Sequence, residues 1–283
     1  MFSFFKSKAS PKKRLKKILG DYEIPSFPAV VMQILGKIRS PYSSAADIAQ
    51  SLSADPGLSV KLLSIANSAA FSPLNKVENL TQAIALVGLS QLESLVLGVG
   101  VAKGIPKKAC QYHDPKEFWL TSARRAMLSF ELAQILCPAK ESECFTAAFL
   151  QDMALPFLAC HRADDYDEVF KKWHLEGGNL AELEREVLEW DHAQVATWIC
   201  SEWGLPENIA FSIKNHHNPK IDSDKDTLGP VRLVSLLNED AETNGLDELI
   251  AKAGDSYDIP EEKMQSIIES SFEKAKDLAK MIV

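Results

Sequence analysis

DPGLSVKLLSIANSAAF, residues 55–71, is the stretch that decides the fold. Asp55 followed by Pro56 is typical of a helix start, because the carboxylate can cap a backbone N–H and proline fits the first turn. Apolar residues then recur at helical spacing, at Leu58, Leu62, Leu63 and Ile65. Asn67 and Ser68 follow, where short polar side chains can bond the backbone groups that a helix end leaves open. We therefore expect a helix here and a structural role for Asn67 and Ser68; ligand binding by them is the alternative.

The same periodicity extends on both sides of this stretch. Ser44 and Asp47 have the spacing of a capping box, and apolar residues recur every three or four positions over 30–38. Further helical patterns cover 81–87, 90–102, 116–136, 143–155, 180–190, 192–203, 206–217, 228–238 and 260–282. We find no convincing alternating strand and no repeat of fixed period. The predicted fold class is all-α.

Two polar, proline-containing breaks, at 106–115 and 218–226, divide the chain. We expect four parts, which are a basic N-terminal tail (1–20), an N-terminal helical part (21–105), a second helical part (116–217) and an acidic C-terminal helical extension (227–283). From residue 221 on, 15 acidic residues stand against 7 basic ones.

The composition is that of a globular chain, with 46% hydrophobic and 25% charged residues among 283. No apolar run is long enough for a membrane span. The five cysteines are odd in number and form no C-x-x-C pair, which suits a reducing cytoplasm. We therefore expect a cytoplasmic protein.

Charge is unevenly distributed. Seven basic residues and no acidic ones lie in residues 1–20, so the net charge of −8 leaves −15 on the rest of the chain. This argues against a nucleic-acid surface. Residues 45–63 nevertheless have the rhythm of a helix-turn-helix, so DNA binding stays an alternative, although the second helix offers one cation, Lys61. The basic head is either a frayed, solubilising tail or a peripheral contact with an acidic membrane.

Four polar residues stand on apolar helical faces. Asp152 follows Phe149 by three residues, His192 heads an apolar stripe, and His216 and His217 continue another. Inward-pointing carboxylate and imidazole groups from separate helices could converge on a divalent metal. Taken singly, each residue is also consistent with an ordinary hydrogen-bonded core position.

The sequence resembles the HDOD family, bacterial signalling modules related to the HD and HD-GYP metal phosphohydrolases. The resemblance rests on the order and spacing of short motifs, which are Ile24–Pro28, Ala54–Leu58, Leu62–Phe71, Ala83–Gly88, Phe118-Trp119, Ala147–Asp152, Asp191-His192, Trp203–Pro206 and His216-His217. It implies a multi-helix HD-like bundle with an N-terminal helical subdomain.

The resemblance also implies a degenerate metal site. Asp152, His192, His216 and His217 match ligand positions of the active enzymes. Thr121, Gln151 and Asn238 stand where a His, the His of the His-Asp pair and a late Asp are expected. A shell so depleted should not generate the metal-bound hydroxide of a hydrolase. Gln151→His is expected to raise divalent-metal affinity without restoring phosphodiesterase turnover.

The leading hypothesis is therefore a non-enzymatic regulatory module that binds a signalling protein or a small ligand. It is expected to hold no cofactor beyond a weakly bound divalent metal. A residual metal-dependent phosphohydrolase is the alternative.

Overall fold

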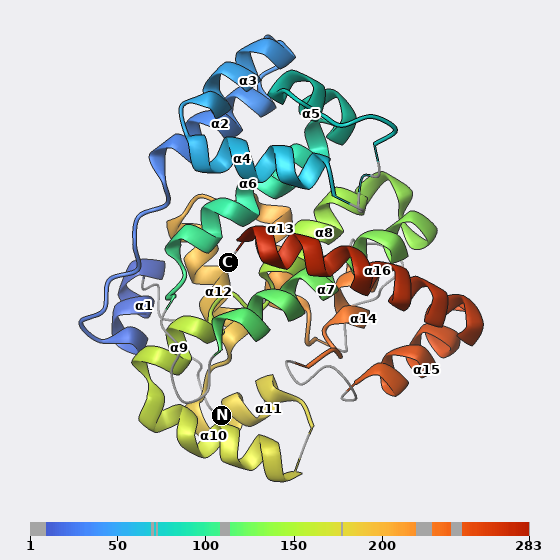
Figure 1. Cartoon of the computed structure of the whole chain (residues 1–283). Coiled ribbons are helices and arrows are strands. Elements are labelled where there is room, and N and C mark those ends of the chain that lie inside the picture. Colours follow the sequence, from blue (N-terminus) through green and yellow to red (C-terminus); the bar gives the residue numbers. More distant parts are fainter. Residues whose placement is uncertain are drawn as a thin grey trace.

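The computed structural model describes residues 10–68, 71, 73–107, 114–176, 178–218, 228–238 and 245–282. Within this part every regular element is a helix, so the all-α prediction is confirmed (Figure 1). The helices are α1 (Pro11–Leu19), α2 (Ala29–Arg39), α3 (Ala45–Ser53), α4 (Pro56–Ala66), α5 (Leu80–Val87), α6 (Leu89–Gly104), α7 (Pro115–Leu136), α8 (Glu141–Leu150), α9 (Leu155–His161), α10 (Ala163–Glu176), α11 (Leu180–Leu188), α12 (His192–Glu202), α13 (Glu207–Asn215), α14 (Leu228–Val234), α15 (Leu246–Tyr257) and α16 (Glu261–Ile282), with a short 3-10 turn (Pro138–Lys140) before α8.

The predicted caps of α3 and α4 are present. Ser44 and Asp47 form a reciprocal capping box, and the Asp55 side chain accepts from the N–H of Leu58 at 3.0 Å. Asp55 also pairs with Lys103 of α6. The cap therefore ties the start of α4 to a second helix as well as to its own first turn.

Helix α1 corrects the expectation of a frayed tail. Its Leu15, Ile18 and Leu19 are buried, and the helix packs against α12 and α9. The lysines of α1 lie on its exposed side, and its apolar face packs against the protein core. Residues 1–9 lie outside the described residues, as do most of the two predicted breaks, at 108–113 and 219–227.

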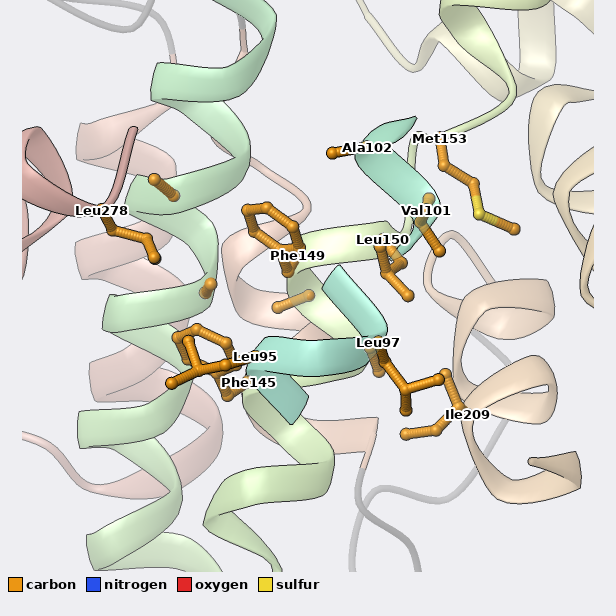
Figure 2. Close-up of a cluster of buried hydrophobic side chains, with 14 of the residues drawn as sticks. Leu95, Leu97, Val101, Ala102, Phe145, Phe149, Leu150, Met153, Ile209 and Leu278 are labelled. Carbon is orange, nitrogen blue, oxygen red and sulfur yellow. The ribbon is translucent and has the colours of Figure 1, made fainter. Parts of the chain in front are cut away.

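The centre of the molecule is built on α7 and α8. Helix α16 lies along α7 (Figure 1), and α6 and α13 pack on α8. Figure 2 shows this core, where Leu95 of α6 and Leu278 of α16 lie on the side of Phe145 and Phe149 of α8, and Ile209 of α13 lies beside Leu97 of α6. Helix α6 approaches α8 closely at Gly98, because a Cβ there would lie 2.9 Å from the Phe149 ring.

The expected helix over 143–155 is broken into α8 and α9. Helix α8 ends at Leu150, and residues 151–154 form turns. Pro156 explains the break, because proline inside a helix removes one backbone hydrogen bond and clashes with the preceding turn. Gln151 and Asp152 are therefore held in a buried turn rather than on a continuous helix.

Among the described helices, no single one has the length and hydropathy needed to cross a membrane. Helices α5 and α6 meet that test only as a pair, and they are bent by 111° at Gly88. Much of α6 is buried in the core of Figure 2.

Candidate functional site

The structure brings four predicted residues together. Asp152 comes from the α8–α9 turn, His192 from the first turn of α12, and His216 and His217 directly follow α13. Each offers one ligand atom, and these atoms all lie within 4.8 Å of one another. Asp152, His192 and His216 are buried, and His217 is partly buried. Residues up to 65 positions apart in sequence thus form one cluster.

The separations within the cluster suit a metal shell. The Nε2 atom of His192 lies 3.3 Å from that of His216 and 3.1 Å from that of His217. Asp152 Oδ1 lies 3.3 Å from His192 Nε2 and 3.2 Å from His216 Nε2. A four-coordinate metal with bonds of 2.0–2.1 Å spaces its ligands by about 3.3 Å. By donor type and spacing alone, a transition metal fits.

Local sequence explains how the histidines are presented. Asp191 caps α12 by accepting from the N–H of Gln194 at 2.7 Å, which fixes the first turn and hence His192. Helix α13 ends at Asn215, so His216 turns inward, with its Nδ1 2.5 Å from the carbonyl oxygen of Ile213. That contact leaves Nε2 of His216 facing Asp152.

A buried carboxylate orients His192 from behind. Glu184 of α11 accepts from the backbone N–H of His192 at 2.8 Å and lies 2.6 Å from its Nδ1. Its other oxygen accepts from the hydroxyl of Tyr166 at 2.5 Å. Such a carboxylate behind an imidazole is the usual support of a metal-binding histidine, and it serves a protonated imidazole equally well.

Arg125 of α7 is a cation that contacts the cluster. Its Nη1 donates to Asp152 Oδ2, and its Nε and Nη2 donate to the carbonyl oxygen of Leu237, with the Nε bond at 3.0 Å. The side chains of Arg125 and Asp152 are 7% and 8% exposed, so the ion pair is shielded from water. The single carboxylate of the four-residue cluster is therefore already neutralised.

The pKa shifts agree with this charge pattern. Burial raises the pKa of Asp152, but Arg125 and the two facing imidazoles outweigh it and hold that pKa well below its usual range. Burial lowers the pKa of His192, yet Glu184 and Asp152 together raise it to about 10. Burial and the neighbouring histidines hold the pKa of His217 well below its usual range.

The three substituted positions are Thr121, Gln151 and Asn238. Thr121 and Gln151 are buried, and their side-chain polar atoms have no hydrogen-bond partner among the described residues. Arg125 lies one helical turn beyond Thr121 on α7. Asn238 is partly buried, and the contact to the site in this region comes from the carbonyl of its neighbour, Leu237.

The N-terminal motif residues lie apart from this cluster and make local contacts. Asn67 at the end of α4 bonds the backbone of Leu63 and Val77, and the Ser68 hydroxyl donates to the carbonyl of Ile65 at 2.7 Å. Pro56 occupies the first turn of α4, as expected from the sequence. These contacts support the structural interpretation of the motif.

Sequence reasoning missed Arg125 and Glu184. Both could have been noticed, because each is a charged residue on an otherwise apolar helical face. Arg125 precedes buried Leu128 and Leu132 by three and seven residues, and Glu184 lies midway between Leu180 and Leu188. The apolar periodicity does not show which residue Arg125 or Glu184 contacts.

Comparisons with known proteins agree with the fold and the motifs. The family model for the HDOD domain matches residues 24–219. An "Uncharacterized protein" of Treponema pallidum (strain Nichols) is 23% identical over 209 residues, which cover 69% of this chain and 38% of that protein. The chain thus spans well under half the length of this curated relative.

Two solved structures share the fold. One, from Shewanella amazonensis SB2B and described as "Putative phosphohydrolase", has a TM-score of 0.74 at 18% identity, covering 95% of this chain and 98% of that one. Another, from Marinobacter aquaeolei VT8 and described as "Putative signal transduction protein", has a TM-score of 0.73 at 16% identity, covering 99% and 63%. At these identities the likeness concerns the fold alone.

Proposed function

Because the chain belongs to the HDOD domain family, we propose that it is a non-enzymatic regulatory module that acts by binding a protein or a small ligand. The observation that carries the proposal is the ion pair between Arg125 and Asp152. It places a permanent positive charge on the only carboxylate of the candidate metal cluster.

The chemistry of the ligand set supports this proposal. In metal-dependent hydrolysis the metal lowers the pKa of a bound water and so supplies the nucleophile. Gln151 and Thr121 replace two expected histidine ligands by an amide and a hydroxyl. Asp152, which would balance the metal's charge, instead bonds a guanidinium. Asp152 and the three histidines of the cluster are therefore suited to joining the helices that carry them.

Two concave regions offer places for a binding partner. An open groove of about 940 Å³ lies at the end of α4, and Val60, Leu63, Lys76 and Glu78 are among the residues that line it. A more enclosed cavity of about 230 Å³ is lined mainly by apolar side chains from α4 to α8 and α16. The groove is the better candidate for a protein segment, because Val60 is 63% exposed there.

The structure gives little support to DNA binding through a helix-turn-helix. Helices α3 and α4 are present, but Lys61 is partly buried, and burial together with Lys107 and Lys103 lowers its pKa. Phosphate contacts dominate DNA affinity, so an otherwise acidic surface is a poor platform.

The proposal is tested by assaying untagged protein against phosphomonoesters, phosphodiesters and cyclic dinucleotides with Mn²⁺, Mg²⁺ or Zn²⁺. We expect no turnover, and less than one equivalent of tightly bound metal by elemental analysis. Metal-dependent turnover that disappears in both Asp152→Ala and His192→Ala would contradict the proposal.

A residual phosphohydrolase is the second candidate, favoured by the convergence of four ligand atoms within 4.8 Å. It requires that Asp152 bind a metal through Oδ1 while Arg125 donates to Oδ2. Stoichiometric metal in the untagged protein would favour this candidate before any substrate is tested.

A further inference from the structure

Arg125 is buried, which is rare for an arginine unless its charge is paired. It stands on the buried side of α7 and is 5% exposed. Three of its nitrogens are engaged, one by Asp152 Oδ2 and two by the Leu237 carbonyl. A buried guanidinium is tolerated only with such partners, because it keeps its proton at any accessible pH.

The same carboxylate would be needed by a metal. Asp152 is the only acidic residue in the cluster with His192, His216 and His217. Its Oδ1 faces two imidazoles at 3.2–3.3 Å but has no partner with hydrogen-bond geometry among the described residues. Its Oδ2 is held by Arg125. A divalent ion at this place would meet a fixed positive charge on the far side of its only anionic ligand.

We infer that Arg125 is a built-in cation that substitutes for the metal in this site. The guanidinium neutralises Asp152 and ties it to Leu237, so the histidine cluster keeps its geometry without a bound ion. Replacing Arg125 by a neutral side chain therefore uncovers a transition-metal site made of Asp152, His192, His216 and His217. This inference rests on the proposed function, since it explains how the altered site is held together.

The arginine also changes what is expected of Gln151→His. Adding an imidazole beside Asp152 leaves the carboxylate bound to Arg125. We therefore expect little gain in metal affinity from Gln151→His alone, in contrast to the expectation from sequence. Gln151→His should raise affinity only when it is combined with the loss of Arg125.

The test compares untagged Arg125→Met with wild type and with Arg125→Lys, using Zn²⁺ and Co²⁺ as the probes. Methionine keeps the length and removes the charge, whereas lysine keeps the charge. Calorimetry should show that Arg125→Met binds one equivalent of Zn²⁺ at least about tenfold more tightly than wild type. Arg125→Lys should stay near wild type. Adding His192→Ala to Arg125→Met should abolish the gain, which separates this site from surface thiols and imidazoles.

A folded Arg125→Met protein with the Zn²⁺ affinity of wild type would overturn the inference, as would an equal gain in Arg125→Lys. Should Arg125→Met be unfolded in the apo form, it is refolded with and without Zn²⁺ and followed by circular dichroism. Recovery that depends on Zn²⁺ and on His192 supports the substitution of one cation for another. Failure to recover with Zn²⁺ refutes it.

These outcomes are independent of the test of the proposed function. Hydrolysis by wild-type protein would refute the non-enzymatic role, whatever the affinity of the Arg125 variants. Unchanged affinity in Arg125→Met would refute the cation substitution while leaving the non-enzymatic role intact.

Discussion

Replacing Asn67 tests whether the motif at the end of α4 is structural. The Asn67 side chain joins the helix terminus to Val77, ten residues further on. Its Oδ1 accepts from the Val77 N–H at 2.8 Å. Its Nδ2 donates to the carbonyls of Leu63 at 2.8 Å and Val77 at 2.9 Å. Asn67→Ala removes all three bonds and leaves the Val77 peptide without these partners.

The expected cost follows from these three bonds. A neutral hydrogen bond contributes about 0.5–1.5 kcal/mol net, so three that are partly exposed should contribute about 2–3 kcal/mol. Unfolding entropy of about 2.1 cal/mol/K per residue amounts to ~0.6 kcal/mol/K for a chain of this length. We therefore expect Asn67→Ala to lower the Tm by about 4 °C.

Scanning calorimetry and thermal circular dichroism measure this shift. Two controls refine it. Asn67→Asp keeps the acceptor for Val77 but places a carboxylate oxygen against the carbonyls of Leu63 and Val77, so its Tm should be no higher than that of Asn67→Ala. Ser68→Ala removes a single bond, to Ile65, and should lower the Tm by no more than about 2 °C.

An unchanged Tm in Asn67→Ala would show that these bonds do not stabilise the fold. If that variant also lost binding to a native partner, Asn67 would be a recognition residue of the groove that it lines. The structural reasoning would then be wrong.

Three further changes probe the interior and the caps. Glu184→Ala should destabilise the fold by about 3–5 kcal/mol in urea unfolding, because it leaves Tyr166 and the protonated His192 without their buried partner; a loss below about 1 kcal/mol would contradict the network. Gly98→Ala should cost about 1–3 kcal/mol by overpacking against Phe149, and a silent change would show that the ring can move away. The Lys103 side chain and the backbone N–H of Leu58 bond Asp55 and lower its pKa, so its stabilising effect is complete above the ordinary value of 3.8 and is lost as the pH falls through the lowered one. The stability gap between wild type and Asp55→Asn should therefore shrink below about pH 4, and a gap that persists to pH 2 would count against the cap.

The helices and their ends could be read from the sequence because their causes are local. Ser44, Asp55 and Asp191 each cap a helix through a backbone group within three residues, so short motifs were sufficient. The apolar periodicity predicted most helices within a few residues. One difference, at 151–154, also has a local cause, because Pro156 ends α8 early. The predicted ranges did not include α1, α10 or α15.

The candidate site could be predicted only in part. The resemblance gave Asp152, His192, His216 and His217, and the structure brings these four together. Whether a metal binds them is not a property of those residues alone. It depends on Arg125, which is 27 residues from Asp152 and 112 from Leu237.

Tertiary structure decides the charge of this site because Coulomb interactions act between neighbours in space, regardless of sequence separation. Asp152 surrounded by imidazoles alone would predict a metal site. With the buried guanidinium of Arg125 on its other oxygen, Asp152 is instead part of a buried ion pair. The sequence shows an arginine on the apolar face of α7, and only the packing of α7 against α8 and α14 shows which charge it meets. The sequence by itself therefore determined the helical shell and the candidate ligands, and the fold determined that Asp152 meets the guanidinium of Arg125.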